Sequence, residues 1–404
     1  MGRWNRLVVL VLGVLLVSWG GPAASAFWSS VSSNGAAAKA DALAQGNKPS
    51  VAVGQAGNVA VTWAASTTAA GKPVSGYTIA RYSSATGGTS TAGSGTCAVV
   101  VTALTCTDVA TTGSWYYVVT PTVSLWQGAE SLRSAVATVD ATAPVAPTVT
   151  APAYVVPANV SNVPVSGTAE ANSTVVLTVT DVGAAHTVTQ TRTANSSGAW
   201  SATTLNLSTF NAGIITYSAR ATDAAGNTGP AGTTTSVKDT TAPTVTGVQL
   251  VNGGATPGKV EQGDKVVVTF SEALDASKIC STWTDDTVKQ RLGGDNQVTV
   301  SISNSDNLTV SSTGCTLRFG TVALGGNYAS GSMSFKGTSA NASVLEWDPA
   351  AKTITITLGT QSGNSNSTPQ SAASAKFTPS SGHSDIAGNA LATSQVTDPT
   401  ASRF

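Results

Sequence analysis

Charged side chains are scarce in this chain. Asp, Glu, Lys and Arg make up 10% of its 404 residues, where about 25% is usual. The 20 basic and 20 acidic residues balance, so no positive excess is available to attract phosphate, and nucleic acid is not an expected partner. Hydrophobic residues reach 41%. A chain with this hydrophobic content and no net charge is expected to fold rather than to remain disordered.

The patterns of common catalytic sites are also absent from the sequence. It has only two histidines, His186 and His383, and neither has the spacing of a zinc site. We find no nucleophile elbow, phosphate-binding loop or dinucleotide fingerprint. His383, Ser384 and Asp385 are consecutive, and adjacent residues cannot adopt the geometry of a catalytic triad. We therefore predict a protein that is not an enzyme and that needs no cofactor.

Apolar runs long enough to span a membrane are missing. The N-terminal apolar stretch covers residues 7–19, which is shorter than the roughly 20 residues of a spanning helix. Arg3 and Arg6 precede it, and the small residues ASA at 24–26 follow it. This order is that of a secretory signal peptide. We predict a signal peptide over residues 1–26, no membrane span after its cleavage, and a secreted or cell-surface location; an uncleaved N-terminal anchor is the alternative.

One short phrase occurs twice and divides the remaining chain. DATAP at residues 140–144 returns as DTTAP at 239–243, and the interval matches the roughly 100 residues of an immunoglobulin-like sandwich. The abundant Thr, Ser and Val and the short alternating segments between turn residues predict strands. We predict an all-β chain of three tandem β-sandwiches. The expected divisions after the signal peptide are a spacer at 27–47, with a short helix at 35–43, and three modules at 48–142, 143–240 and 241–404.

The four cysteines lie beyond the predicted signal peptide and form no CxxC pair. Four cysteines allow three pairings, and disulfides are favoured over free buried thiols in an exported protein. Pairing within modules is simplest, because separate domains do not readily hold their cysteines within bonding distance. The predicted disulfides are therefore Cys97–Cys106 and Cys280–Cys315.

The first module has a pattern of aromatic residues on its expected strands. It has a Trp in the second strand, a Tyr in the third, a Leu before the sixth, and an aromatic-x-aromatic-x-Val sixth strand: Trp63, Tyr77, Leu104, Trp115, Tyr117 and Val119. These residues resemble those of a fibronectin type III domain over about 49–140. The resemblance implies that they belong to the core, whereas the Cys97–Cys106 pair is not typical of the family.

The second and third modules resemble bacterial surface domains. In the second, SGTA at 166–169, GAW at 198–200 and the strand before DAAGN at 223–227 resemble a bacterial immunoglobulin-like repeat. In the third, QGDKVVVTFS at 262–271 and DIAGN at 385–389 resemble the opening and closing of S-layer-type immunoglobulin-like domains. Residues of about 281–345 are not explained by that resemblance. We expect them to form an insertion or extra strands held by the second disulfide.

The two DxxGN segments have a structural and a functional interpretation. Asp and Asn side chains hydrogen-bond to nearby backbone and Gly takes positive φ, so each segment predicts a stable turn. Their oxygens are also calcium ligands, although one turn offers fewer than the six to eight oxygens that Ca²⁺ takes. The candidate metal ligands are Asp223, Asn227, Asp385 and Asn389.

Carboxylates gather at the start of the third module: Glu261, Asp264, Glu272, Asp275, Asp285 and Asp286. Paired carboxylates at the right separation hydrolyse glycosides, but nothing in the sequence determines the separation here. We expect solvated loop charges, and Ca²⁺ binding is the more credible of the two functional options.

Three tryptophans are candidates for stacking on sugar rings. Trp126 lies in a turn-rich stretch, Trp283 is close to two acidic residues, and Trp347 follows Glu346. A carbohydrate-binding protein using these residues is therefore the alternative to our main hypothesis. That hypothesis is a non-catalytic exported bacterial protein that acts as an adhesive, spacer or matrix component; a hydrolase is the weakest option. Expected partners are cell-wall or extracellular polysaccharide, or surface proteins.

Overall fold

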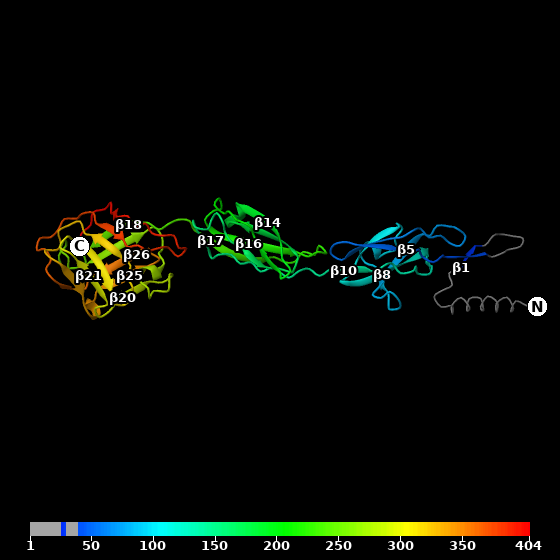
Figure 1. Cartoon of the computed structure of the whole chain (residues 1–404), viewed down its shortest axis with the longest axis horizontal. Coiled ribbons are helices and arrows are strands. Elements are labelled where there is room, and N and C mark those ends of the chain that lie inside the picture. The colour runs from blue at the N-terminus through cyan, green and yellow to red at the C-terminus, as the bar shows by residue number, and fades with distance from the viewer. Residues whose placement is uncertain (1–25, 30–38) are drawn as a thin grey trace, which may run out of the picture.

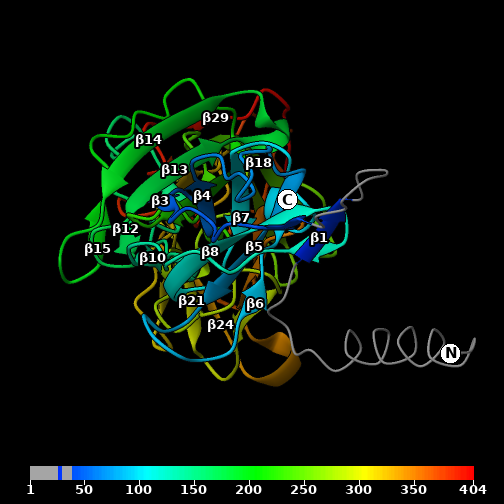
Figure 2. The ribbon, with the colours of Figure 1, turned by 90° about the vertical axis from the view of Figure 1, so that its right-hand side faces the viewer.

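The computed structural model describes residues 26–29 and 39–404. Figure 1 shows three β-sandwich modules in a row along the longest axis, with the C-terminus in the module at one end. Figure 2 looks along that row, and the modules project onto one another as expected of an elongated arrangement. The chain is all-β, as predicted, with short helical turns between strands. The predicted signal peptide lies outside the described residues, apart from Ala26.

A short hairpin precedes the first module. β1 (Ala26–Ser29) pairs antiparallel with β2 (Lys39–Ala42). The helix expected at 35–43 is therefore wrong for its described part, where the backbone bonds to a partner strand. Among the described residues, no helix is long and apolar enough to cross a membrane.

The first module packs two sheets around one core. Their strand orders are β3-β4-β7 and β10-β8-β5-β6, and β9 pairs with β8. Trp63 and Tyr77 meet edge to face in this core, with ring centroids 5.3 Å apart. The strands and the single 3₁₀ turn of this module are β3 (Ser50–Val53), β4 (Asn58–Thr62), β5 (Gly76–Tyr82), β6 (Thr91–Ala92), η1 (Gly95–Cys97), β7 (Thr105–Val109), β8 (Gly113–Val123), β9 (Trp126–Gln127) and β10 (Ala137–Val139).

One marker of the fibronectin resemblance is not a core residue. Leu104 is 41% exposed and precedes β7 rather than the strand that carries Trp115 and Tyr117. Its backbone carbonyl accepts a hydrogen bond from the Trp63 N–H. Leu104 therefore contributes to the sheet through its backbone, while Tyr117 and Val119 are fully buried as expected.

The second module has the sheets β11-β17-β16-β13-β14 and β12-β15. Strand β13 alternates because Val175, Leu177 and Val179 point into the core and the residues between them point outward. Trp200 joins that core. The elements are β11 (Tyr154–Val155), β12 (Ser166–Thr168), β13 (Thr174–Thr180), η2 (Val182–Ala184), β14 (Thr187–Thr193), β15 (Ala199–Ser201), β16 (Gly213–Thr222) and β17 (Gly232–Lys238).

The third module contains one hydrophobic cluster that runs from Val245 to Phe404. Its sheets have the orders β18-β19-β26-β25-β20 and β27-β24-β21-β22-β23-β28-β29, and we call the second the wide sheet. The elements are β18 (Val245–Val251), β19 (Lys265–Phe270), α2 (Ala276–Ile279), β20 (Gln290–Gly293), β21 (Val298–Ile302), β22 (Asn307–Ser312), β23 (Gly320–Ala323), β24 (Met333–Lys336), η3 (Ser339–Asn341), β25 (Val344–Asp348), β26 (Thr353–Thr357), β27 (Thr360–Ser362), β28 (Lys376–Pro379) and β29 (Val396–Thr397).

The segment 281–345 is integral to this module. It supplies β20 to one sheet and the neighbouring strands β21, β22, β23 and β24 to the wide sheet. The Cys280–Cys315 disulfide forms at its start, with Cα atoms 5.6 Å apart. The Cys97–Cys106 disulfide also forms, with Cα atoms 5.3 Å apart. Both predicted pairings are confirmed.

Candidate functional site

The repeated phrase and the repeated turn meet in space at both joints between modules. In the first joint, Asn227 Nδ2 donates to the Asp140 carbonyl at 3.1 Å. In the second, Asn389 Nδ2 donates to the Asp239 carbonyl at 3.2 Å. Each DxxGN turn of one module therefore binds the first residue of the linker that enters that module. The sequence contains both motifs twice but does not reveal that they are partners.

Each turn is built so that its Asn side chain points at the linker. Asp223 accepts from the Asn227 backbone N–H at 2.8 Å and from Asn227 Nδ2 at 2.7 Å. Asp385 accepts the equivalent pair from Asn389, both at 2.8 Å. The glycine before each Asn has positive φ, which glycine adopts without strain. The turns are therefore the hydrogen-bonded structures that the sequence predicts.

The linkers have a matching local structure. The Asp140 side chain accepts from the Thr142 N–H at 3.0 Å, and the Asp239 side chain accepts from the Thr241 N–H at 3.1 Å. Such Asp-to-backbone bonds two residues ahead stabilise a turn. The linker Asp therefore has two functions: its side chain shapes the linker, and its carbonyl receives the next module.

At the second joint, three carboxylates come together. The ligand atoms of Asp239, Glu272 and Asp385 lie within 4.8 Å of one another. Burial raises the pKa of the Glu272 carboxyl, and the nearby Asp239 and Asp385 raise it further, against the lowering effect of Lys352. Glu272 Oε1 is buried without a hydrogen-bond partner. In the described part of the chain, no such group of three occurs at the first joint.

The residues of this cluster fit calcium only in part. Three carboxylates offer the right atom type but fewer ligands than the six to eight oxygens that Ca²⁺ takes. Both Asp385 oxygens already accept hydrogen bonds from Asn389, and Nδ2 of Asn227 and of Asn389 donates to the turn Asp and to the linker carbonyl. Calcium binding by Asp223, Asn227, Asp385 and Asn389 stays a prediction.

The other acidic residues at the start of the third module shape loops. Asp264 is fully buried and accepts from the Gly253, Gly254 and Glu261 N–H groups. Asp275 caps α2, Asp286 accepts from the Ala276 N–H, and Asp285 accepts from the Thr287 N–H. These carboxylates are occupied by backbone donors, so the arrangement favours a structural role over a glycosidase pair.

Of the three tryptophans proposed for sugar stacking, two belong to the core. Trp347 is fully buried and Trp283 is 4% exposed, so neither ring face is available to a sugar. Trp347 packs edge to face on Phe270, with centroids 6.1 Å apart. These two predictions are wrong because both residues point inward from the chain segments around the shared cluster. Trp126 is 41% exposed and retains an accessible ring.

Trp126 lines a small pocket of about 140 Å³ at the edge of the first module. Leu43, Pro73 and Val123 form apolar walls, and Asp41 and Lys72 provide charges. The pocket combines an aromatic face with polar groups of both signs, which is suited to one ring of a polar ligand.

A buried ionic network in the first module was not found from the sequence. Asp108 is fully buried; it contacts Arg81 through an ion pair and accepts from Tyr117 Oη at 2.8 Å. Burial alone would raise the pKa of Asp108, but hydrogen bonds from Ser94, Arg81 and Tyr117 hold it below its usual value. The Arg81 guanidinium also lies 5.0 Å from the Trp115 ring centroid. The sequence feature that could have revealed this network is Asp108 itself, an acidic residue at an inward-facing position of the alternating strand β7.

The two histidines lie in different modules and differ in their surroundings. His383 is buried, and burial lowers its pKa to about 4, with Arg318 lowering it further against a hydrogen bond involving Phe319. His186 Nδ1 contacts Asp181 at 2.6 Å beside the β13–β14 turn. His383 is therefore neutral at physiological pH and serves the core of its module.

No family model and no curated protein matches this chain. Among solved structures, the chain is similar to the FN1–FN3 domains of chicken CNTN1, at 12% identity over 89% of this chain and 100% of that chain, with a TM-score of 0.26. It is also similar to a tetra-tandem repeat from the extending region of a large adhesion protein, at 17% identity over 88% of both chains and a TM-score of 0.25.

A third similar structure comes from a study of how a 1.5-MDa bacterial ice-binding adhesin is retained at the host cell surface. Its identity is 16% over 78% of this chain and 98% of that chain, with a TM-score of 0.27. Scores and identities at this level carry no argument about function. The tandem all-β architecture is established by the sheets of this chain, and its role is inferred from its own residues.

Proposed function

We propose that this chain is an exported, non-catalytic surface or secreted protein that acts as a spacer and adhesive or matrix component. The observation that carries the proposal is the repeated joint. At 3.1 and 3.2 Å, Asn227 and Asn389 hold the linker carbonyls of Asp140 and Asp239 in the same way. A repeated joint between sandwiches transmits a defined orientation from one module to the next.

Packing beside the first joint supports a restricted orientation. A Cβ placed on Gly226 would lie 2.6 Å from Gln55 Cγ, so the second module touches the β3–β4 turn of the first. Gly229 packs against the Pro144 carbonyl, where a Cβ would approach to 2.1 Å. Proline also stiffens a linker. These contacts favour a spacer whose length is maintained.

Export is supported by the two disulfides, because disulfides persist in oxidising compartments outside the cytosol. The signal-peptide pattern at residues 1–26 points to the same location. The absence of a catalytic motif and the structural use of the acidic residues favour a non-enzymatic role. Adhesion to polysaccharide or to surface proteins is part of the proposal.

The first test measures the shape of the mature chain from residue 27 onward. Small-angle X-ray scattering should give the pair-distance distribution of an elongated particle, and sedimentation velocity should give a high frictional ratio. A compact particle with a globular frictional ratio would contradict the spacer role. Adhesion is then tested by retention on insoluble cell-wall and polysaccharide preparations.

A carbohydrate-binding role for the first module is the second candidate, and exposed Trp126 beside its pocket favours it. Trp126→Ala should then abolish retention on polysaccharide, since stacking on an aromatic ring supplies most of the apolar contact to a sugar. Leu125→Ala is the matched control, because Leu125 is 96% exposed and does not line the pocket. Retention that is equal in both variants would exclude this pocket.

A further inference from the structure

The wide sheet presents a continuous row of hydroxyl groups on its outer face. Its register aligns one hydroxyl residue from each of six neighbouring strands. Residues paired across strands point to the same face, at about 4.8 Å spacing. In order from β27 to β28, the members are Ser362, Ser334, Ser301, Thr309, Thr321 and Thr378.

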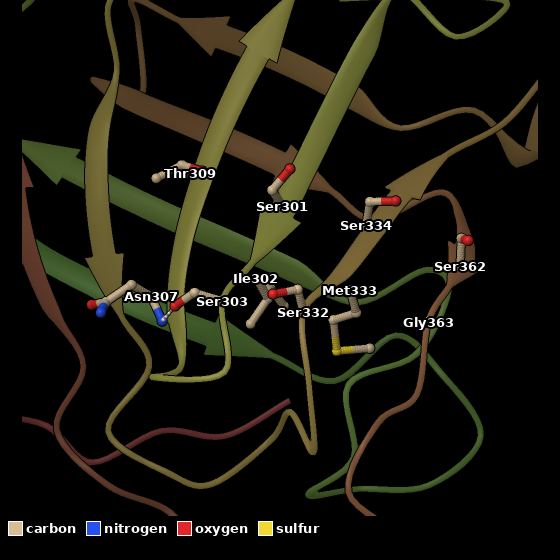
Figure 3. A pocket seen from close by; sticks show the side chains of 10 residues that line it. All are labelled: Ser301, Ile302, Ser303, Asn307, Thr309, Ser332, Met333, Ser334, Ser362 and Gly363. Carbon is tan, nitrogen blue, oxygen red and sulfur yellow. Dashed lines mark hydrogen bonds between the residues drawn. The ribbon is translucent and has the colours of Figure 1, made fainter.

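Part of this row lies in an open hollow of about 470 Å³, within the volume range of small-molecule sites. Figure 3 shows Ser301, Thr309, Ser334 and Ser362 on adjacent strands around it. Ser303, Asn307 and Ser332 extend the polar wall, and Ile302, Met333 and Gly363 complete the lining. None of the ten lining residues is charged.

The hydroxyls in the hollow have bonding capacity to spare. In the part of the chain that the structure describes, no hydrogen bond involves the side chains of Ser301, Thr309, Ser334 or Ser362. Each hydroxyl offers one donor and two acceptor positions. Ser303, in contrast, accepts from the Asn307 N–H at 3.3 Å and so helps to hold the hollow's edge.

Strand propensity does not account for this choice of residues. Threonine is favoured in strands, but serine is not among the residues enriched there. Three of the four hydroxyl residues that the row contributes to the hollow are serines. Their small side chains leave the space that larger strand-forming residues would fill. Serine therefore stands at the strand positions where the surface is hollowed.

We propose that this hollow binds a neutral glycan laid across the strands. A glycan presents alternating hydroxyl donors and acceptors, which match unpartnered Ser, Thr and Asn groups. The absence of charge from the lining disfavours an anionic polymer, and the absence of aromatic side chains from it disfavours a protein interface. The inference deepens the proposed adhesive function by naming the class of partner and its site.

The test is affinity electrophoresis of the mature chain in gels containing hydroxyethyl cellulose, laminarin or soluble starch. Polygalacturonate serves as the anionic comparison. At least one neutral glucan should retard the wild type. The triple variant Ser301→Ala, Thr309→Val, Ser334→Ala should bind roughly tenfold more weakly, because it loses three hydrogen-bonding groups.

A matched control exists on the second module. Thr189, Thr178 and Ser218 form a similar cross-strand row on the outer face of β14, β13 and β16. The triple variant Thr189→Val, Thr178→Val, Ser218→Ala should bind as the wild type does. Equal loss in this control would overturn the proposal, since binding would then depend on hydroxyl surface in general.

A second variant tests the same site in case the triple variant does not fold. Ser362→Ile, at an exposed position on the rim, should fill the hollow without adding an aromatic face and should weaken binding, while the melting temperature stays that of the wild type. The inference is overturned if no neutral glucan retards the wild type, or if Trp126→Ala alone abolishes retardation. Either result leaves the spacer function intact, because scattering measures that function separately.

Discussion

Asp108 shows how a single side chain can organise a small sandwich. Its carboxylate is fully buried and accepts hydrogen bonds from Arg81, Tyr117 and both the backbone and side chain of Ser94. A buried charge is tolerated only when it is paired and hydrogen-bonded. The network connects β5, β7 and β8 and therefore ties the two sheets of the first module together.

Asp108→Asn should destabilise the first module by about 3 kcal/mol, because the buried Arg81 guanidinium then has no negatively charged partner. Calorimetry of the mature chain measures the change in the transition of that module. Tyr117→Phe is the graded control and should cost only about 1 kcal/mol, since it removes one hydrogen bond. A wild-type transition in Asp108→Asn would show that the network does not stabilise the module.

Glu272 has the opposite electrostatic situation at the second joint. Burial, Asp239 and Asp385 raise its pKa, so the folded state favours the protonated form and is penalised as the pH rises above the ordinary glutamate range. Glu272→Gln should therefore stabilise the third module by about 0.5–1 kcal/mol at pH 7 and have little effect at pH 4.

Calorimetry at the two pH values tests this prediction. A Glu272→Gln variant that is less stable than the wild type at pH 7 would contradict it. Repeating the pH 7 scan with millimolar CaCl₂ or with a chelator tests the metal prediction. If calcium binds to the cluster, it should raise the melting temperature of the wild type and not that of the variant.

At the scale of elements, the two DxxGN turns are equivalent in hydrogen bonding but not in surroundings. Gly226 and Gly388 have φ of +85° and +97°. A Cβ on Gly226 would collide with Gln55 of the first module, whereas a Cβ on Gly388 would meet nothing within 4 Å. The first joint is therefore reinforced by a contact between modules at a position where the second turn is open.

Gly226→Ala and Gly388→Ala separate these two effects. Both should lose about 1 kcal/mol of stability, because a non-glycine residue is strained at positive φ. Only Gly226→Ala should also loosen its joint, because Gln55 must move. Distances between spin labels on the flanking modules, measured by electron spin resonance, should broaden in that variant alone. Broadening of equal size in both variants would contradict the role of Gln55.

At the scale of the whole molecule, orientation depends on few contacts relative to each module's core. The three hydrophobic clusters are separate, so the modules are held in a row mainly by the linkers and by the Asn227 and Asn389 bonds. Small interfaces between domains allow relative motion by default. The joints therefore determine whether the modules keep a fixed relative orientation or move independently of one another.

The double variant Asn227→Ala, Asn389→Ala should keep the core transitions of the modules and broaden the pair-distance distribution in X-ray scattering toward shorter distances. The physical reason is that both linker carbonyls lose their donor. The pair Asn195→Ala, Asn206→Ala is the control, since these Asn side chains stabilise turns within the second module. Identical scattering from the double variant and the wild type would show that the linkers alone determine the orientation.

Much of this architecture follows from local pattern. The alternation in β13 and the period between the DATAP and DTTAP phrases predicted tandem sandwiches. The placement of two cysteines in each of two modules predicted both disulfides. These properties depend on the two-residue period of a strand and on chain length, and both can be read from the sequence alone.

Other properties depend on which surfaces meet, and only the tertiary structure decided them. Trp283 and Trp347 are core residues because strands distant in sequence cover them, and the part of the expected helix at 39–42 is a strand because it has a pairing partner. The hydroxyl row needs the register of six strands, and each Asn–linker bond joins residues 87 or 150 positions apart. Sequence determines what each segment can form; long-range pairing determines which side chains share a face, a core or a joint.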